Sequence, residues 1–263
     1  MNTSLTSVTR KDFFEYWKSI DNAKVKTDIE LMSALHSLDQ YSRMSNSGYS
    51  ITNRVEMRFE RVNLNFIRPY SKHFAENYIK QGYQYSFDQM RKDYLEFNFQ
   101  TYLRLIDKEL KLYPFEKRPQ FEAFLDMHYR LNPCDTHFYR ILQHLKVLET
   151  DNENFPVLYI NHITDISFLK KQDNSTLAIK SSEGKINFFH FDGCSKRTID
   201  NKIFSDRELS ILGLLEKGFS SKQIADILFI SPHTVDTHRS NMLEITNCIN
   251  TTAMIIYCRM LGM

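Results

Sequence analysis

The sequence predicts two structural units: an α+β domain, in which helices precede a five-stranded antiparallel sheet, and a C-terminal all-α domain of four helices. Between residues 121 and 191, short runs of aromatic and β-branched residues alternate with turn residues, which is typical of successive antiparallel strands. After residue 203, apolar residues recur every three to four positions, which indicates helices. A length of 263 residues fits two such units.

The first unit is expected to consist of an N-terminal helical segment, residues 1–48, and a domain that spans residues 49–191. In the helical segment, Thr27 and Glu30 have the spacing of a capping box, and apolar residues follow at helical intervals. Because the strands of the domain are not interleaved with helices, a parallel sheet is excluded. The polar stretch 192–203 is expected to be a linker.

The second unit, residues 204–263, carries a signal for the start of each of its four helices. The capping residues are Ser205 with Glu208, Ser220 with Gln223, Ser231 before Pro232, and Asn250 or Thr251. A short helix, a three-residue turn and a further helix form a helix-turn-helix, whose second helix enters the DNA major groove. The polar residues on its first two turns are of donor and acceptor type, as base reading requires: His233, Thr234, Asp236, Thr237, Arg239, Ser240 and Asn241.

Composition excludes several function classes. The chain has 7 glycines, where average usage predicts about 18, and it has no G-x-G-x-x-G or G-x-x-x-x-G-K-[ST] motif, so the common nucleotide-binding loops are not expected. The 34 basic and 32 acidic residues leave a formal charge of +2, which excludes a polycation that coats nucleic acid. No Ser/His/Asp or Cys/His arrangement has a supporting motif, so the chain is not expected to be an enzyme.

The expected compartment is the cytoplasm, with no membrane partner. No apolar run approaches the roughly 18 residues that a membrane span needs. The stretch from Met1 to Trp17 lacks the apolar core of a signal peptide. The four cysteines form no C-x-x-C pair, so we expect reduced thiols and no metal site.

Three runs in the last sixty residues resemble the LuxR-type (GerE-type) DNA-binding domain: FSDRE at 204–208, GFSSKQIA at 218–225 and ISPHTVDTHRSN at 230–241. The resemblance implies a bacterial transcription regulator that binds double-stranded DNA as a homodimer, with RNA polymerase as a further candidate partner. By the family's pattern, Asp236, Thr237 and Ser240 would face bases. The residues that would hold phosphates are Ser221, Lys222, Thr234 and Arg239. His238 would buttress the recognition helix from its inner edge.

The candidate DNA-binding residues are therefore Ser221, Lys222, Ser231, His233, Thr234, Asp236, Thr237, Arg239, Ser240 and Asn241. The last helix of the family pairs two subunits, and the corresponding candidates here are Met254, Ile255, Tyr257 and Cys258.

The C-terminal domain departs from the family's pattern in its charge. Residues 204–263 contain five basic and six acidic side chains, a net charge of −1, although phosphate neutralisation supplies much of the affinity for DNA. Ile245 stands where the family usually has a basic residue that contacts a phosphate, and Asp236 is often lysine. We therefore expect Ile245→Lys to strengthen binding to all DNA sequences alike. The alternative is an interaction or ligand-sensing module whose helix-turn-helix has lost DNA binding.

The strand region has a second resemblance, to the C-terminal half of a PAS domain. It rests on Tyr129–Leu131, the turn at 132–135, the strand that runs to Leu148, and the Thr164-Asp165-Ile166-Ser167 run. The resemblance implies a PAS-like sensor domain over residues 49–191, which would bind a small molecule or a partner and set the spacing of two recognition helices. Two DNA half-sites would then be read about one helical turn apart.

The sequence does not identify a cofactor or ligand for this sensor. It lacks the Asn-Cys-Arg-Phe run of flavin photoreceptors, and its one tryptophan disfavours an acyl-homoserine-lactone sensor. Three histidines in strand-like runs are expected to be surface or hydrogen-bonded residues rather than haem ligands: His128, His144 and His162. Upstream aromatic residues are expected to pack in the core, with the lining of a pocket as the alternative: Phe59, Phe66, Phe97, Phe99 and Tyr102.

Overall fold

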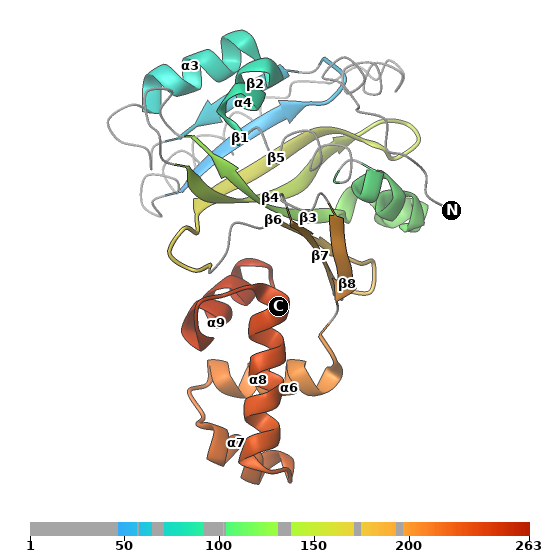
Figure 1. Cartoon of the computed structure of the whole chain (residues 1–263). Coiled ribbons are helices and arrows are strands. Elements are labelled where there is room, and N and C mark those ends of the chain that lie inside the picture. Colours follow the sequence, from blue (N-terminus) through green and yellow to red (C-terminus); the bar gives the residue numbers. More distant parts are fainter. Residues whose placement is uncertain are drawn as a thin grey trace.

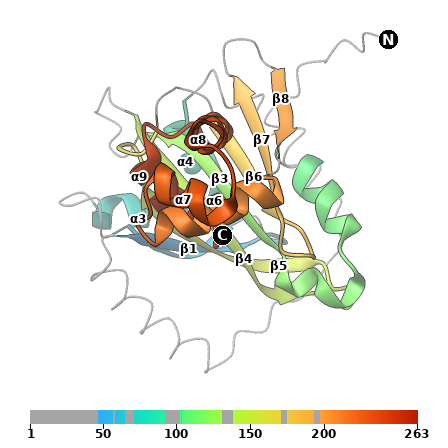
Figure 2. The same cartoon turned by 90° about the horizontal axis from the view of Figure 1, so that it is seen from below.

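A computed structural model shows a large antiparallel sheet with helices over one face and a four-helix C-terminal domain against the other (Figures 1 and 2). It describes residues 47–56, 58–64, 71–91, 102, 104–130, 138–170, 175–192, 197–202 and 204–263. The helical segment predicted over residues 1–48 lies almost wholly outside the described residues.

The sheet has eight strands in the order β2-β1-β5-β4-β3-β6-β7-β8. The five strands predicted from the sequence are present: β3 (Glu122–Tyr129), β4 (Tyr139–Thr150), β5 (Pro156–Asp165), β6 (Ser175–Lys180) and β7 (Ile186–Asp192). They are not a simple meander, because β6 pairs with β3 and the chain must therefore cross back after β5.

The prediction of only five strands is wrong, because three further strands complete the sheet. These are β1 (Gly48–Asn53), β2 (Arg58–Asn63) and β8 (Arg197–Lys202). Strand β8 occupies half of the linker predicted over residues 192–203, so this polar stretch also forms part of the sheet. An edge strand such as β8 forms through backbone pairing, here with β7, and its composition can therefore stay polar.

The helices of the first domain pack on one face of the sheet. They are α3 (Ser71–Gln81), α4 (Tyr83–Gln89) and a helical stretch at residues 104–112, followed by the 3-10 helix η1 (Phe115–Gln120). Side chains of α4 and of the 104–112 stretch share a core cluster with Met127 and Ile141 of the sheet. Figure 1 shows α3 and α4 on the opposite side of the sheet from the C-terminal domain.

Alternation along the strands directs neighbouring residues to these two sides. Leu125 and Met127 of β3 face the helices, whereas Phe124 belongs to the cluster that joins the sheet to the C-terminal domain. Asp126 shares the face of Phe124 because side chains two positions apart point the same way. One face of the sheet thus packs against the helices of the first domain, and the other face packs against the C-terminal domain.

The C-terminal domain consists of α6 (Asp206–Glu216), α7 (Ser221–Leu228), α8 (Pro232–Thr246) and α9 (Thr251–Met260). The predicted caps are confirmed at all four starts: capping boxes at Ser205 and Ser220, and side-chain caps at Ser231 and Asn250. Gly218 adopts φ +85°, the left-handed conformation that ends α6. Among the helices that the structure describes, none has the length and hydropathy that crossing a membrane requires.

Candidate nucleic-acid interface and ligand cavity

The helix-turn-helix is formed by α7, a three-residue turn and α8. The C-terminal end of α8 meets the sheet, where the carbonyl oxygen of Thr246 accepts a hydrogen bond from Lys170, so its N-terminal half projects away from the sheet domain (Figure 1). On that half, Val235 is fully buried and holds the helix against α6 and α7. The predicted base-facing residues lie on the outer side, where Asp236, Thr237 and Ser240 are exposed.

The other predicted DNA-binding residues gather around the same end. His233, Asn241, Ser231 and Lys222 are exposed, and Ser221, Thr234 and Arg239 are half-buried. Ser231 has a structural role, because its hydroxyl oxygen accepts from the backbone N–H of Thr234 at 3.0 Å. The structure therefore brings the predicted residues together on one surface.

Three of these residues bond to one another, and one of them also bonds to Thr251 of α9. The Asp236 carboxylate accepts a hydrogen bond from the Ser221 hydroxyl at 2.7 Å and lies 3.2 Å from Nη1 of Arg239. Arg239 also donates to Ser221 at 2.6 Å and to the Thr251 hydroxyl at 2.9 Å. The network ties α7, α8 and α9 together, and its carboxylate offsets the charge of the arginine expected to bind a phosphate.

The inner edge of α8 contains His238, as predicted. Its Nδ1 lies 3.9 Å from Oε1 of Glu208, the same glutamate whose Oε2 accepts from the backbone N–H of Ser205 at 2.9 Å in the capping box of α6. His238 thus lies beside the start of α6, which fits its expected part in positioning the recognition helix.

The prediction that a lysine at position 245 would contact a DNA phosphate is wrong. Ile245 is only 7% exposed and packs in the core, and Thr246 beside it is fully buried, with its hydroxyl donating to the carbonyl oxygen of Met242 at 2.8 Å. A lysine at position 245 would bury a charge there rather than present it to DNA.

The assignment of a subunit interface on α9 also needs correction. Met254, Tyr257 and Cys258 are fully buried within the chain, so their side chains are not available to a second subunit in this conformation. Ile255 is half-buried. The apolar side chain that α9 exposes is instead Ile256, at 37% exposure, one position away from the predicted set.

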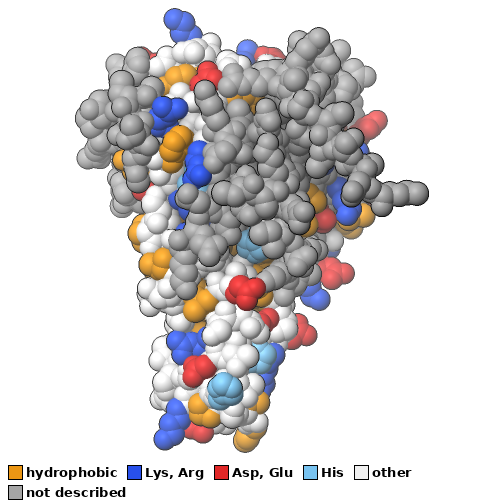
Figure 3. All heavy atoms as spheres, in the orientation of Figure 1, with side chains coloured by type: hydrophobic (Ala, Val, Ile, Leu, Met, Phe, Trp, Pro, Cys, Tyr) orange, Lys and Arg blue, Asp and Glu red, His pale blue; other side chains and the backbone are white. Residues whose placement is uncertain are grey.

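Charges of both signs are mixed on this domain. Figure 3 shows basic, acidic and histidine side chains side by side on the visible face of the C-terminal domain, below the sheet domain. This agrees with the near-neutral charge of residues 204–263 and shows no large basic patch on that face. For this domain to bind DNA, the affinity would have to come from a few well-placed cations and from base contacts.

Replacing Phe229 with glycine is expected to stabilise the C-terminal domain by about 0.5–1 kcal/mol. Phe229 ends α7 at φ 53°, a left-handed conformation that is unfavourable for a residue with a side chain, and the residue is 94% exposed. Urea unfolding followed by circular dichroism measures the change. Phe229→Ala, which removes the ring but keeps the strain, should give no gain; an equal gain would assign the effect to the exposed ring.

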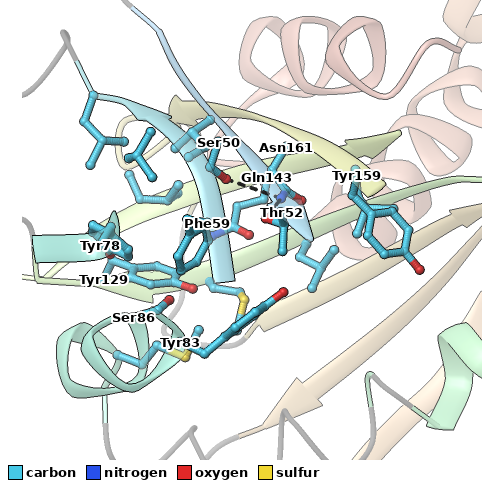
Figure 4. Close-up of a pocket in the computed structure, with 18 of the residues that line it drawn as sticks. Ser50, Thr52, Phe59, Tyr78, Tyr83, Ser86, Tyr129, Gln143, Tyr159 and Asn161 are labelled. Atoms are coloured by element: carbon cyan, nitrogen blue, oxygen red, sulfur yellow. Dashed lines mark hydrogen bonds between the residues drawn. The ribbon is translucent and has the colours of Figure 1, made fainter. Parts of the chain in front are cut away.

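A cavity of about 150 Å³ lies between the sheet and the helices that cover it (Figure 4). Its walls come from β1 to β5, from α3 and α4, and from the helical stretch around Tyr102 and Ile106. Phe59 and Tyr102, two of the aromatic residues considered from the sequence, line it, whereas Phe66, Phe97 and Phe99 lie outside the described residues. The three histidines considered as haem ligands are not among its described lining residues.

The described lining residues are all uncharged, and a group of amides and hydroxyls lies among the apolar ones. Asn161 Nδ2 donates to the hydroxyl oxygens of Thr52 at 3.1 Å and Ser50 at 3.3 Å. Figure 4 shows Gln143 beside this group, and Tyr83, Ser86 and Tyr129 across the cavity from it. Burial raises the pKa of Tyr129, so its hydroxyl stays protonated at neutral pH. The site suits a small neutral molecule with polar substituents.

Comparison with known proteins bears on the C-terminal domain. The family model described as "Bacterial regulatory proteins, luxR family" matches residues 202–258. The oxygen regulatory protein NreC of Staphylococcus carnosus is 38% identical over 56 residues, which are 21% of this chain and 26% of NreC. The transcription regulator BvgA of Bordetella pertussis is 40% identical over 53 residues, 20% of this chain and 25% of BvgA.

The aligned part thus spans about a quarter of the length of these two relatives. A solved structure of Vibrio cholerae VqmA with ligand and DNA is 13% identical, and the alignment covers 84% of both chains at a TM-score of 0.30. The match over the capped four-helix region is specific. Residues 202–258 thus form a helix-turn-helix domain of the type found in the luxR family of bacterial regulatory proteins.

Proposed function

We propose that the chain is a transcription regulator that binds double-stranded DNA sequence-specifically and responds to a small molecule in its sheet domain. The observation that carries this proposal is the outer face of α8. A capped and packed helix-turn-helix of the luxR type presents exposed Asp236, Thr237 and Ser240 where base edges would lie.

The expected DNA contacts divide into two groups. The first group comprises exposed residues of α8 that would face the bases: His233, Asp236, Thr237, Ser240 and Asn241. The second group would contact phosphates on either side of these bases. It consists of the cations of Lys222 and Arg239 and the hydroxyls of Ser221 and Thr234.

Binding of the full-length chain to a duplex of arbitrary sequence tests the phosphate contacts of this proposal. With Lys222→Ala, we expect the slope of log affinity against log salt to fall by about 0.9, because one phosphate contact is lost. Fluorescence anisotropy over a salt series measures it. Lys185→Ala, an exposed lysine of the β6–β7 turn, is the matched control and should leave the slope unchanged. Equal slopes for both variants would place the DNA contact elsewhere.

The second candidate function is a sensing or interaction module whose helix-turn-helix no longer binds DNA. The mixed charges of the C-terminal domain and the pairing of Asp236 with Arg239 favour it. It predicts that DNA binding is undetectable even at low salt, which the same anisotropy series would show.

We also propose that the sheet domain is PAS-like and that the protein acts as a homodimer. Helices that enclose a cavity on one face of an antiparallel sheet support the first statement. For the second, the exposed apolar side chains of Ile249 and Ile256 are the surface that α9 and its preceding loop offer to a second copy. RNA polymerase remains a candidate partner of the DNA-bound form.

The cavity indicates the class of ligand. A cavity of about 150 Å³ lined by apolar side chains is large enough for one aromatic ring. Because the described lining carries no charge, we expect a neutral, single-ring molecule whose polar groups replace or join the hydrogen bonds around Asn161.

Filling the cavity with Ser86→Phe is expected to abolish stabilisation by such a ligand. Ser86 is buried in α4 and borders the cavity, so the added ring occupies the ligand's place. A panel of single-ring compounds is tested by thermal shift. A bound compound at a hundred times its Kd stabilises the native chain by about 2.7 kcal/mol, and Ser86→Phe removes this gain. Ile79→Phe, an exposed position of α3, is the control. If a compound stabilises both variants alike, it binds outside the cavity.

A further inference from the structure

A buried lysine lies within the largely apolar contact between the C-terminal domain and the sheet. Lys170 follows β5, and its Nζ donates to the carbonyl oxygen of Thr246 at the end of α8, at 2.6 Å. The same Nζ lies 3.2 Å from the ring centroid of Tyr257 in α9, and its side chain is fully buried. A cation over an aromatic ring is attracted by the electron density of the ring. Beside it, the backbone N–H of Ile249 donates to the carbonyl oxygen of Leu169 at 2.9 Å.

Behind this lysine, the sheet holds an ion pair. The Asp126 carboxylate accepts from Nε of Arg140 at 2.5 Å and from Nη2 at 2.7 Å, and its Oδ2 lies 3.5 Å from Nζ of Lys170. Burial alone would raise the pKa of Asp126, but Arg140 and Lys170 hold it below its usual value. One carboxylate thus faces two cations at the contact with the C-terminal domain.

Burying these three charges makes the contact weaker than apolar side chains of the same volume would make it. Taking ionised groups out of water costs several kcal/mol for each ion, and a shared carboxylate recovers only part of it. When the domains separate, water can reach Lys170 and Tyr257 again. The pKa of Lys170, lowered by burial to about 8, reflects the same cost.

The charged residues and the cavity occupy opposite faces of the same two strands. In β3, Asp126 lies between Leu125 and Met127, which line the cavity, and in β4, Arg140 precedes the lining residue Ile141. A shift of β3 or β4 caused by a molecule in the cavity would therefore move Asp126 and Arg140 as well.

We propose that Lys170, Asp126 and Arg140 keep the docking of the DNA-binding domain on the sheet releasable, through the contact of Lys170 with the end of α8 and with α9. In the proposed function, this contact would connect the cavity to the DNA-binding domain. The docking itself does not depend on the proposed function; only its effect on DNA binding does. The docked domain keeps α8 in one orientation relative to the sheet. The released domain can reorient α8 to match a second half-site.

The experiment reads docking without DNA, through the thiol of Cys248. Cys248 is fully buried, and its backbone forms an isolated antiparallel β-bridge with that of Lys170. Alkylation of its thiol by iodoacetamide therefore requires the contact between the domains to open. Labelling of the full-length chain at one pH is followed by peptide mass spectrometry, which separates Cys248 from the other cysteines. Its result is independent of whether the chain binds DNA.

Two substitutions should shift the labelling rate in opposite directions. Asp126→Asn leaves Lys170 and Arg140 facing each other without a carboxylate, and Cys248 labelling should accelerate at least about tenfold, the equivalent of about 1.4 kcal/mol. Lys170→Met keeps the Asp126–Arg140 pair and removes the desolvated ammonium, so labelling should slow. Lys146→Met, an exposed lysine of β4, should leave the rate unchanged.

A purely structural role for Lys170 predicts that both substitutions loosen the contact. Faster or unchanged labelling in Lys170→Met would therefore overturn the proposal. This variant decides the question even if Asp126→Asn does not fold, because it leaves the ion pair of the sheet intact.

Discussion

Replacing Asp236 with lysine is expected to raise the affinity of the full-length chain for DNA at least about tenfold at about 0.1 M salt. The Asp236 carboxylate is exposed on the face of α8 that we assign to DNA, and it is bound to Ser221 and Arg239. Its removal frees Arg239 for a phosphate and places a new cation beside it. The affinity should rise for all sequences, and the slope against log salt should steepen by about 0.9 for each further phosphate that the protein neutralises.

Anisotropy titrations over a salt series measure both quantities. The matched control is Glu183→Lys in the β6–β7 turn, which changes the net charge of the chain equally but lies in the sheet domain. If Glu183→Lys raises the affinity as much as Asp236→Lys, the effect is one of total charge. If neither variant changes it, the N-terminal half of α8 does not lie against DNA.

Replacing Arg140 with methionine is expected to destabilise the sheet domain by about 3–5 kcal/mol, because it leaves the buried Asp126 carboxylate without its bidentate partner. Arg140 and Asp126 are among the most buried charged side chains described, with exposures of 5% and 0%. Urea unfolding monitored by circular dichroism gives the free energy of unfolding.

The control removes all the charges together. The triple variant Asp126→Leu, Arg140→Met, Lys170→Met replaces the cluster by apolar side chains and should unfold within about 1–2 kcal/mol of the native chain or be more stable. A triple variant as unstable as Arg140→Met alone would show that the cluster acts through its shape and not through its charge.

The C-terminal domain could be read closely from the sequence because its signals are local. Each helix start has a side chain that bonds within three residues. Three appear where Ser205, Ser220 and Ser231 predicted them, and the fourth is capped by Asn250, one of the two candidates there. The outer face of α8 follows from the same helical spacing. The start of α8 therefore fixes which of its side chains reach the surface.

Positions that depend on long-range packing were predicted less well. Tyr257 is enclosed because α9 packs against the sheet, and no local sequence pattern indicates that contact. Strand β1 was missed because its sequence GYSITN is short and mostly polar, although it lies between β2 and β5 and is fully buried. The Asp126–Arg140 pair joins neighbouring strands, and only the register brings the two residues together.

The central claim is that α8 reads base pairs. Selection of sites from a random pool of double-stranded DNA by the full-length protein at low salt tests it most directly. We expect enrichment of an inverted repeat whose half-sites lie about one helical turn apart, as two recognition helices of a dimer require. The enriched sequence should lose its advantage when Thr237 and Ser240 are replaced by alanine. No enrichment at any salt concentration would contradict the claim.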